Sequence, residues 1–222
     1  MNNSLNWVPC SPPQPVVLTG NYCRLEPMRV QHADELFAAS MAPGFEDRFR
    51  YLTIRPQSRE EFSLWLDQYS RSTDPLYFVV IDLKTNRCEG RQSLMRIDCN
   101  HGVIEIGNIL WGPAMARSRI ATEAFFLSAQ YLFETLGFRR FEWKCDAFNL
   151  PSRNAALRFG LTFEGVFRQH MVIKGLNRDT AWFSMLDSEW VSTKKMFTGW
   201  LASENFDSQG RQRSRLQDFR IQ

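Results

Sequence analysis

The sequence has few of the residues and runs that mark metal-binding, secreted or membrane proteins. Its five cysteines are an odd number, and no two of them form a C-x-x-C pair, which argues against a disulfide framework or a zinc site. The three histidines stand far apart. No stretch approaches the roughly 18 apolar residues of a membrane span, and the first residues lack the basic and apolar segments of an export signal. We therefore expect free thiols, no metal, no membrane contact and a cytoplasmic location.

The chain also lacks a strong charge of either sign. Its formal net charge is +3 and its isoelectric point is about 8.7. This balance is too mild to indicate a nucleic-acid partner, although it suits an anionic cofactor. Several arginines near the C-terminus leave nucleic-acid or ribosome binding open as a weaker alternative. That alternative predicts a salt-dependent affinity that is lost when the chain is truncated after Glu204.

Apolar and aromatic residues are abundant. Hydrophobic residues make up 44% of the sequence and aromatic residues 14%, including 18 Phe and 7 Trp, so the chain can bury a large core. A length of 222 residues fits one mixed α/β domain. We expect a flexible lead-in over residues 1–15, one domain over residues 16–204 and a flexible, arginine-containing tail over residues 205–222.

Apolar periodicity and capping residues locate the expected elements. Helices are expected over residues 32–41, 58–70, 119–136 and 188–203, and from about residue 151 to residue 160. Strands are expected over residues 16–25, 76–83, 90–97, 104–111, 141–147, 161–174 and 180–186. The longest helix is expected to end at Gly137, a suitable left-handed cap.

Two strand-to-helix junctions hold the densest pattern of polar and small residues. Residues 104–124 run as a strand, a Gly-Pro turn and a helix start, and residues 141–160 run as a strand ending at Asn149 and a helix starting near Pro151. A helix N-terminus leaves about four N–H groups unpaired and carries roughly half a positive charge. This suits an anion such as a pyrophosphate. Two such junctions side by side predict a nucleotide-like cofactor.

The order of these motifs resembles a known enzyme family. Ala121-Thr122-Glu123-Ala124 opens one helix, Asn149-x-x-Ser152 opens the next, and Gly160 and Phe163-Glu164-Gly165 follow. This pattern is similar to the acetyl-CoA core of GNAT N-acetyltransferases, particularly the RimJ/RimL-like branch, and residues 104–184 carry nearly all of it. The resemblance implies an α/β (α+β) GNAT fold, with a mixed, mostly antiparallel central sheet, one splayed parallel strand pair and flanking helices.

The resemblance also implies a site for acetyl-CoA as co-substrate. The amides of its pantetheine arm would pair with the strand at Ile109, Leu110 and Trp111, where splayed strands leave an open edge. The pyrophosphate would rest on N–H groups at the following helix start, which comprises Arg117, Ser118, Arg119, Ile120, Ala121 and Thr122. The side chains of Arg117 and Arg119 could add charge-assisted hydrogen bonds.

One position departs from the family signature Gln/Arg-x-x-Gly-x-Gly/Ala. With Ala121 at the last position, Ala116 takes the first and Arg119 replaces the middle glycine, which normally lets the backbone approach phosphate. The side chain of Arg119 could instead clamp an adenosine phosphate. Alternatively, Arg117 and Arg119 could only solvate the helix start.

Two side chains are candidates for catalysis of acetyl transfer to an amine. Glu105 matches the position where many family members hold a carboxylate facing the acceptor, acting as a base directly or through water; otherwise it is an exposed strand glutamate. Ser152 resembles the hydroxyl that protonates or hydrogen-bonds the CoA sulfur, and Asn149 resembles a pantetheine contact, but capping alone also selects Asn and Ser at a helix start. A backbone N–H of residues 109–111 would meet the oxyanion, and Glu123 is assigned a structural role.

These expectations describe an N-acetyltransferase with direct transfer in a ternary complex. Its partners are acetyl-CoA and an amine acceptor, either a protein N-terminus or a small molecule, and a homodimer is left open. The alternative is a non-catalytic acyl-CoA-binding sensor or partner protein. That alternative predicts tight CoA binding without turnover on any amine.

Overall fold

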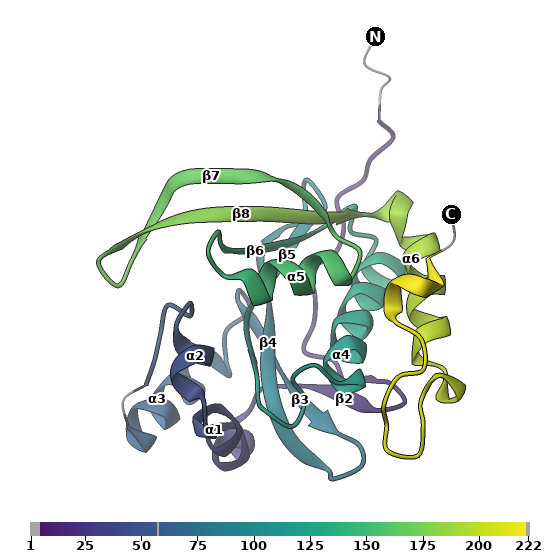
Figure 1. Cartoon of the computed structure of the whole chain (residues 1–222). Helices are drawn as coiled ribbons and strands as arrows, with labels where there is room; N and C mark the ends of the chain where they lie inside the picture. Colours follow the sequence, from purple (N-terminus) through teal and green to yellow (C-terminus); the bar gives the residue numbers. More distant parts are fainter. Residues whose placement is uncertain (1–4, 57, 221–222) are drawn as a thin grey trace.

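One sheet forms the centre of the molecule. The computed structural model describes residues 5–56 and 58–220. Its eight strands follow the order β1-β2-β3-β4-β5-β6-β8-β7, and Figure 1 shows β2 to β8 in place. The strands are β1 (Leu18–Thr19), β2 (Cys23–Pro27), β3 (Leu76–Asp82), β4 (Arg87–Asp98), β5 (Val103–Trp111), β6 (Arg140–Asp146), β7 (Thr162–Ile173) and β8 (Leu176–Leu186). All neighbours are antiparallel except β5 and β6, which are parallel. The expected mixed, mostly antiparallel sheet is confirmed.

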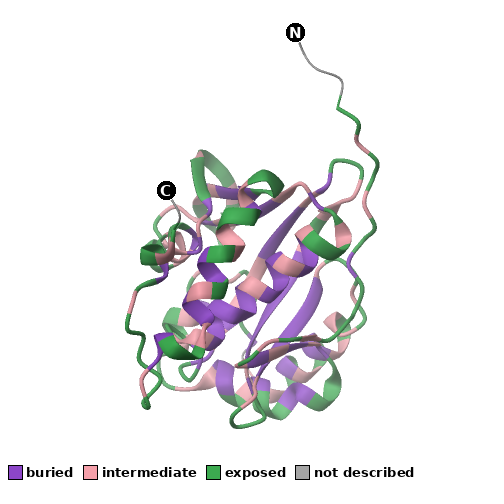
Figure 2. Cartoon of the chain, turned by 90° about the vertical axis from the view of Figure 1, so that its right-hand side faces the viewer, coloured by how far each residue is buried: buried purple, intermediate pink, exposed green. Residues whose placement is uncertain are grey.

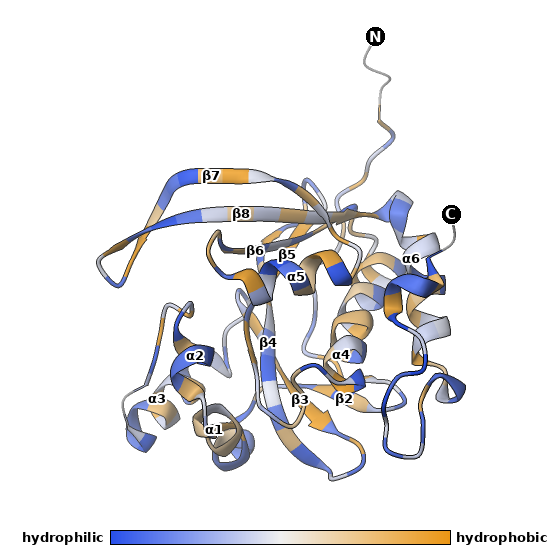
Figure 3. Cartoon of the chain, in the orientation of Figure 1, coloured by the Kyte–Doolittle hydropathy of each residue, from blue (hydrophilic) through white to orange (hydrophobic). Residues whose placement is uncertain are grey.

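Helices cover both faces of this sheet. They are α1 (Ala33–Met41), α2 (Phe45–Phe49), α3 (Arg59–Tyr69), α4 (Arg119–Gln130), α5 (Leu150–Arg158) and α6 (Asp187–Leu201). Helices α1 and α3 contribute to one apolar cluster with β3, and α4 and α6 contribute to a larger cluster on the other face. Figure 2 shows buried residues along the strands and the inward helix faces. Strand β3 is buried along nearly its whole length and is mostly hydrophobic (Figure 3) because both of its faces are covered.

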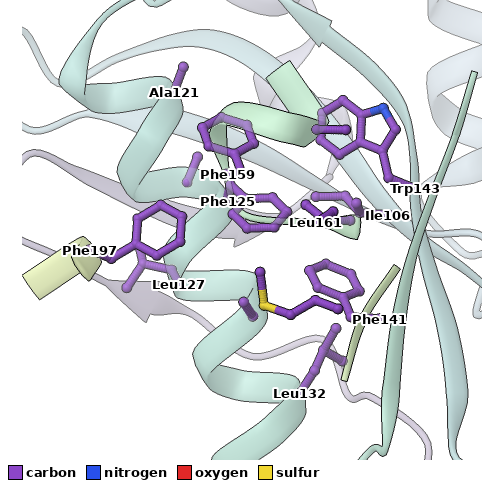
Figure 4. Close-up of a cluster of buried hydrophobic side chains, with 14 of the residues drawn as sticks. Ile106, Ala121, Phe125, Leu127, Leu132, Phe141, Trp143, Phe159, Leu161 and Phe197 are labelled. Carbon is purple, nitrogen blue, oxygen red and sulfur yellow. The ribbon is translucent and has the colours of Figure 1, made fainter. Parts of the chain in front are cut away.

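The main core forms where α4 lies against β6 and α5. The ring of Phe125 stacks on Phe159 with centroids 4.5 Å apart and on Phe141 with centroids 5.4 Å apart. Figure 4 shows Trp143 and Phe197 beside these rings. Such aromatic pairs contribute about 0.5–1.5 kcal/mol each beyond the area they bury. The packing fixes α4 and α5 relative to β6, and therefore positions both helix starts that the sequence singled out.

Helix α4 differs from its prediction near the C-terminal end. Ser118 caps its start by accepting a hydrogen bond from the N–H of Ile120 at 3.1 Å, but regular α-helical geometry ends at Gln130. Residues Tyr131–Leu136 continue as the π-helical turn η2, and Gly137 ends it at φ 74°, as predicted. A single π turn changes the helical period over too few residues to be read from the sequence.

Glu123 is a buried carboxylate that joins α4 to the start of the sheet. Its two oxygens accept hydrogen bonds from the N–H groups of Asn21, Tyr22 and Cys23, each at 2.7 Å. Gly20 is required beside it, because a Cβ at that position would lie 2.3 Å from the Glu123 carboxyl carbon. The structural role predicted for Glu123 is confirmed.

Substitution of Glu123 by glutamine should lower the free energy of unfolding by about 2–4 kcal/mol. The glutamine amide would bring N–H donors against backbone N–H groups, so it would lose charge-assisted bonds and leave buried donors unpaired. Urea denaturation followed by circular dichroism measures this loss. Glu46→Gln, at an exposed position, is the matched control and should change stability by less than about 0.5 kcal/mol. Equal stabilities for the two variants would show that the three hydrogen bonds contribute little.

The C-terminal segment corrects the sequence prediction. A flexible tail was expected over residues 205–222, yet within the described part, up to residue 220, the chain folds back on α6. Phe206 and Leu216 are buried, and the indole N–H of Trp200 donates to Gln212 Oε1 at 3.0 Å and to the carbonyl of Ser214 at 3.1 Å. The short turns η3 (Ser203–Asn205) and η4 (Leu216–Phe219) contain too few residues to show an apolar period, so they could not be predicted from sequence.

The N-terminal lead-in has neither helix nor strand over residues 5–15, but hydrogen bonds attach it to the domain. The indole N–H of Trp7 donates to the carbonyl of Asn100 at 2.7 Å, and the N–H of Gln14 donates to the Tyr131 hydroxyl at 3.0 Å. The first four residues of the predicted lead-in lie outside the described part. Among the described helices, none combines the length and apolar character needed to cross a bilayer.

Candidate active site

Strands β5 and β6 pair only at their beginnings and then separate. Their register runs from Val103 opposite Arg140 to Ile106 opposite Trp143, whereas β5 continues to Trp111 and β6 to Asp146. The expected splayed parallel pair is therefore present. Backbone groups of the two strands beyond this point do not pair with each other, which leaves an open fork between them.

A β-bulge in β5 accounts for the separation. Strand β4 pairs Arg91 with Leu110 and Ser93 with Gly107, so two residues of β5 oppose one residue of β4 in between. The first of these two, Asn108, has φ 50°, a left-handed conformation that Asn tolerates better than most side chains. Bulges bend and twist a strand, and this one turns the second half of β5 away from β6.

Two side chains of β4 hold the bulge in place. The guanidinium of Arg91 donates to the carbonyl of Asn108 at 2.6 Å, and the Ser93 hydroxyl donates to the carbonyl of Gly107 at 3.0 Å. Arg91 is only 5% exposed, and its charge lies over the Trp65 ring at 4.5 Å. Burial lowers the pKa of this guanidinium. Sequence reasoning missed Arg91, because only the cross-strand register brings it to the bulge.

The fork opens into a cavity of about 970 Å³. Its walls come from the divergent halves of β5 and β6, the start of α5, the β7–β8 hairpin and the segment that follows α2. The sequence-predicted site residues that line it are Glu105, Ile109, Leu110, Trp111, Arg117, Asn149 and Ser152. The cavity therefore brings together residues from both strand-to-helix junctions.

The rest of the predicted helix start lies beside this cavity rather than in its wall. Ile120, Ala121 and Thr122 are buried at the beginning of α4, and the Thr122 hydroxyl accepts a hydrogen bond from Arg158 at 2.9 Å. Ser118 is occupied as the helix cap. Ala116 and Arg117, which directly precede the Ser118 cap of α4, nevertheless line the cavity, so the start of α4 adjoins its wall.

The side chain of Arg119 does not lie where a phosphate clamp was expected. Its guanidinium stacks over the Tyr22 ring at 4.1 Å and near the Phe206 ring at 5.3 Å, so it packs against the C-terminal segment. The cation–π contacts satisfy this charge away from the cavity. Arg117, by contrast, is exposed and lines the cavity with φ 60°. The sequence could not separate the two arginines, because the partners of Arg119 come from distant segments.

Asn149 and Ser152 occupy different places at the start of α5. Asn149 is the cap, since its side-chain oxygen accepts a hydrogen bond from the N–H of Ser152 at 3.2 Å. The Ser152 hydroxyl instead accepts a hydrogen bond from the indole N–H of Trp143 at 2.9 Å. This bond leaves the hydroxyl proton of Ser152 to be donated. Burial raises the pKa of the neighbouring Cys145 thiol, and a hydrogen bond to Ser152 partly opposes that rise.

Glu105 is buried in the cavity wall, so the alternative of an exposed strand glutamate is wrong. It is 3% exposed, and Oε2 forms ion pairs with Arg96 and with Lys144, the latter at 3.0 Å. Lys144 also pairs with Glu142 at 2.6 Å and lies 3.9 Å from the centre of the Trp182 ring. Sequence reasoning missed this network because it is assembled across three strands.

Comparison with known proteins identifies the family. The model of the acetyltransferase (GNAT) domain matches residues 23–162. The chain belongs to the GNAT acetyltransferase family. It is 56% identical to a GCN5-related N-acetyltransferase from Brucella melitensis, whose crystal structure superimposes with a TM-score of 0.95 over 97% of this chain and 98% of that chain. A GNAT-family structure from Chromobacterium violaceum is 35% identical, with a TM-score of 0.79 over 86% of this chain and 96% of that chain.

A more distant structure shows the fold alone. It is described as a ribosomal-protein-serine acetyltransferase from Vibrio cholerae and is 19% identical, with a TM-score of 0.68 over 77% of this chain and 97% of that chain. The chain has no match among the curated proteins.

The GNAT family transfers acetyl groups from acetyl-CoA, and the fork suits that donor. Its open strand edges can accept the amides of a pantetheine arm, as in strand addition. The start of α4 beside one end of the cavity can accept a diphosphate. The residues of this acetyltransferase therefore fit acetyl-CoA at both its flexible arm and its charged end.

Proposed function

We propose that this GNAT acetyltransferase transfers the acetyl group of acetyl-CoA to a primary amine by direct attack in a ternary complex. The observation that carries the proposal is the fork between β5 and β6, which opens into a cavity holding Ser152 on one strand-to-helix junction and Glu105 on the other. The C–N bond forms as the C–S bond breaks. Glu105 takes the proton that the amine loses, Ser152 gives a proton to the departing sulfur, and proton exchange with solvent restores both groups. The products are an acetylated amine and CoA.

The donor would be held by backbone groups more than by side chains. Ile109, Leu110 and Trp111 offer the β5 edge beyond the bulge to the pantetheine amides. A backbone N–H of these residues would also meet the negative charge that develops on the acetyl oxygen. The start of α4 would bind the diphosphate, with Arg117 as the adjacent cation. The N–H groups of Ser118, Ile120 and Thr122 already donate to Met115 and Ser118, so the other N–H groups of residues 117–122 would serve.

Ser152 and Glu105 would handle the protons. The Trp143 indole N–H donates to the Ser152 oxygen at 2.9 Å, which leaves the hydroxyl proton for a sulfur that departs through the fork. Asn149 supports this geometry by capping the same helix. Glu105 would accept the amine proton, directly or through water, and its ion pairs with Arg96 and Lys144 fix its position.

The acceptor would be a protein N-terminus, as in the ribosomal-protein acetyltransferases of the RimJ/RimL-like branch, or a small-molecule amine. The fold shared with the Vibrio cholerae protein, which is described as acting on a ribosomal protein, is consistent with that branch. A panel of peptides and small amines assayed for release of CoA thiol tests the proposal. Turnover on at least one primary amine is expected. Tight binding of acetyl-CoA with no turnover on any amine would instead indicate a non-catalytic acyl-CoA sensor.

The variant Glu105→Gln tests the base role. We expect kcat/KM to fall about 100-fold near pH 6.5, where few acceptor amines are neutral, and only about 10-fold near pH 9, where most need no base. Glu142→Gln is the matched control, because Glu142 shares Lys144 but does not line the cavity. An equal loss for Glu105→Gln at every pH would assign Glu105 to positioning alone.

A further inference from the structure

The charged groups that line the cavity are unbalanced. Six cationic side chains reach it, whereas only three carboxylates do. The cations are Arg48, Arg50, Arg96, Arg117, Lys144 and Arg178, and the carboxylates are Asp47, Glu105 and Asp146. A positively charged cavity favours a negatively charged ligand. The partners of each cation show which of them is free to bind one.

Most of these cations already have partners. Arg50 forms an ion pair with Asp47 at 2.7 Å, and Arg96 and Lys144 share Glu105. The guanidinium of Arg48 is used by backbone carbonyls in the α1–α2 connection. Each of these four side chains therefore already has at least one partner in the wall. The Nε of Arg48 is buried without an acceptor, but both of its terminal nitrogens are occupied.

Two cations remain, and they come from different walls of the cavity. Arg117 lies at the start of α4, on the side assigned to the donor diphosphate. Arg178 lies on β8 in the β7–β8 hairpin, which reaches across to α2 (Figure 1) and is attached there by Lys174 Nζ donating to the carbonyl of Phe49 at 3.0 Å. Arg178 therefore belongs to the hairpin wall of the cavity and not to the start of α4, which leaves this wall for the acceptor.

The guanidinium of Arg178 has no partner in the part of the chain that the structure describes. Its Nε is buried without a hydrogen-bond acceptor, and neither an ion pair nor a side-chain hydrogen bond is formed by this residue within residues 5–56 and 58–220. Trp182, four residues further along β8 and on the same face of the sheet, also has a buried indole N–H without an acceptor. A buried donor left unpaired is costly, and a ligand acceptor would remove that cost.

Arg178 also lies near the reacting centre. Its charge acts on the Cys145 thiol, which itself contacts Ser152, and all three residues line the cavity. An anion bound at Arg178 would therefore hold the rest of its molecule beside the fork.

We propose that Arg178 binds an anionic group, a carboxylate or a phosphate, carried by the acceptor amine. The inference rests on the proposed acetyl transfer and specifies its substrate class as amines that bear a negative charge. A guanidinium binds such groups through two parallel N–H bonds. This contact would orient the amine toward the acetyl group while Glu105 accepts its proton.

Matched acceptors test this proposal by CoA release. The pairs are α-amino acids against their C-terminal amides, O-phosphoethanolamine against ethanolamine, and peptides with glutamate against glutamine at the second position. We expect the anionic member of at least one pair to have a kcat/KM about 10- to 100-fold higher than its neutral partner. A difference in the amino-acid pair would indicate a free carboxylate, one in the phosphoethanolamine pair a phosphate, and one in the peptide pair an acidic peptide.

Variants assign the preference to the residue. Arg178→Ala should abolish the preference for the anionic acceptor by raising its KM about 10- to 100-fold, with less than about 3-fold change in the KM of the neutral acceptor. Arg178→Lys should keep part of the preference. Arg168→Ala is the control, since Arg168 is exposed on the same hairpin and does not line the cavity. Equal use of both members of every pair, or a preference that survives Arg178→Ala, would overturn the inference while leaving acetyl transfer intact.

A binding measurement separates this inference from the proposed function. Isothermal titration of N-acetyl amino acids and of their amides into the CoA-bound protein needs no turnover. Tighter binding of the carboxylates in the wild type, lost in Arg178→Ala, would support the anion site even if no amine were acetylated. Equal binding of carboxylates and amides would count against it.

Discussion

The variant Ser152→Ala is expected to lower kcat about 100-fold while changing the Kd for acetyl-CoA by less than about 3-fold. The Ser152 hydroxyl accepts the Trp143 N–H, so its own proton can pass to the departing sulfur. A leaving-group donor acts mainly in the transition state and therefore affects turnover more than donor binding. Steady-state kinetics and isothermal titration with acetyl-CoA measure the two quantities.

Two further variants separate the hydroxyl from its surroundings. Trp143→Phe removes the N–H that holds the Ser152 oxygen and should lower kcat by a smaller factor, about 10-fold, because the hydroxyl remains but is less well placed. Ser208→Ala, at an exposed position, should leave kcat unchanged. If Ser152→Ala had the wild-type kcat, Ser152 would be reduced to part of the α5 start and another group would have to protonate the sulfur.

The variant Arg91→Met is expected to lower kcat/KM about 100-fold although Arg91 does not line the cavity. Its guanidinium holds the carbonyl of Asn108 in the β5 bulge at 2.6 Å, and the bulge sets where the N–H groups of residues 109–111 point. Misplacement of reacting groups by about 1 Å can cost a factor of 100. Donor affinity should also weaken, because the same strand edge binds the pantetheine arm.

Stability should respond differently from activity in this variant. Methionine has a similar length, and Arg91 pairs with no carboxylate among the described residues, so the main cost is the lost hydrogen bond to Asn108, about 1–2 kcal/mol. We therefore expect the free energy of unfolding of Arg91→Met to change by less than about 2 kcal/mol while activity falls. Arg91→Lys should retain part of the activity, and Arg87→Met, at an exposed position on the same strand, is the control. A proportional loss of stability and activity would show that Arg91 supports folding rather than the bulge.

Local rules predicted much of the chain because the signals were local. Gly137 ends the helical segment in the left-handed conformation, as predicted. Ser58, the first residue of the helix expected over residues 58–70, caps α3 by accepting a hydrogen bond from the N–H of Glu61. The short α2 (Phe45–Phe49) was missed, because five residues cannot display a helical period. The turns that pack the C-terminal segment on α6 were missed for the same reason.

The candidate site was predicted unevenly. Glu105, Asn149 and Ser152 were found because each belongs to a contiguous motif, and all three line the cavity. Lys144, the partner of Glu105, could not be found, because the ion pair depends on the parallel register of β5 and β6. Arg119 was assigned to the donor from its place in a motif, but its contacts with Tyr22 and Phe206 are made by residues from both ends of the chain.

The sequence alone determined the family pattern, the two strand-to-helix junctions and the apolar faces, because these depend on residues close together in the chain. The tertiary structure decided the opening of the fork, the burial of Glu105 and the free guanidinium of Arg178. Those features depend on strand register and on which charges find partners, and such pairings between distant residues are fixed only when the sheet assembles.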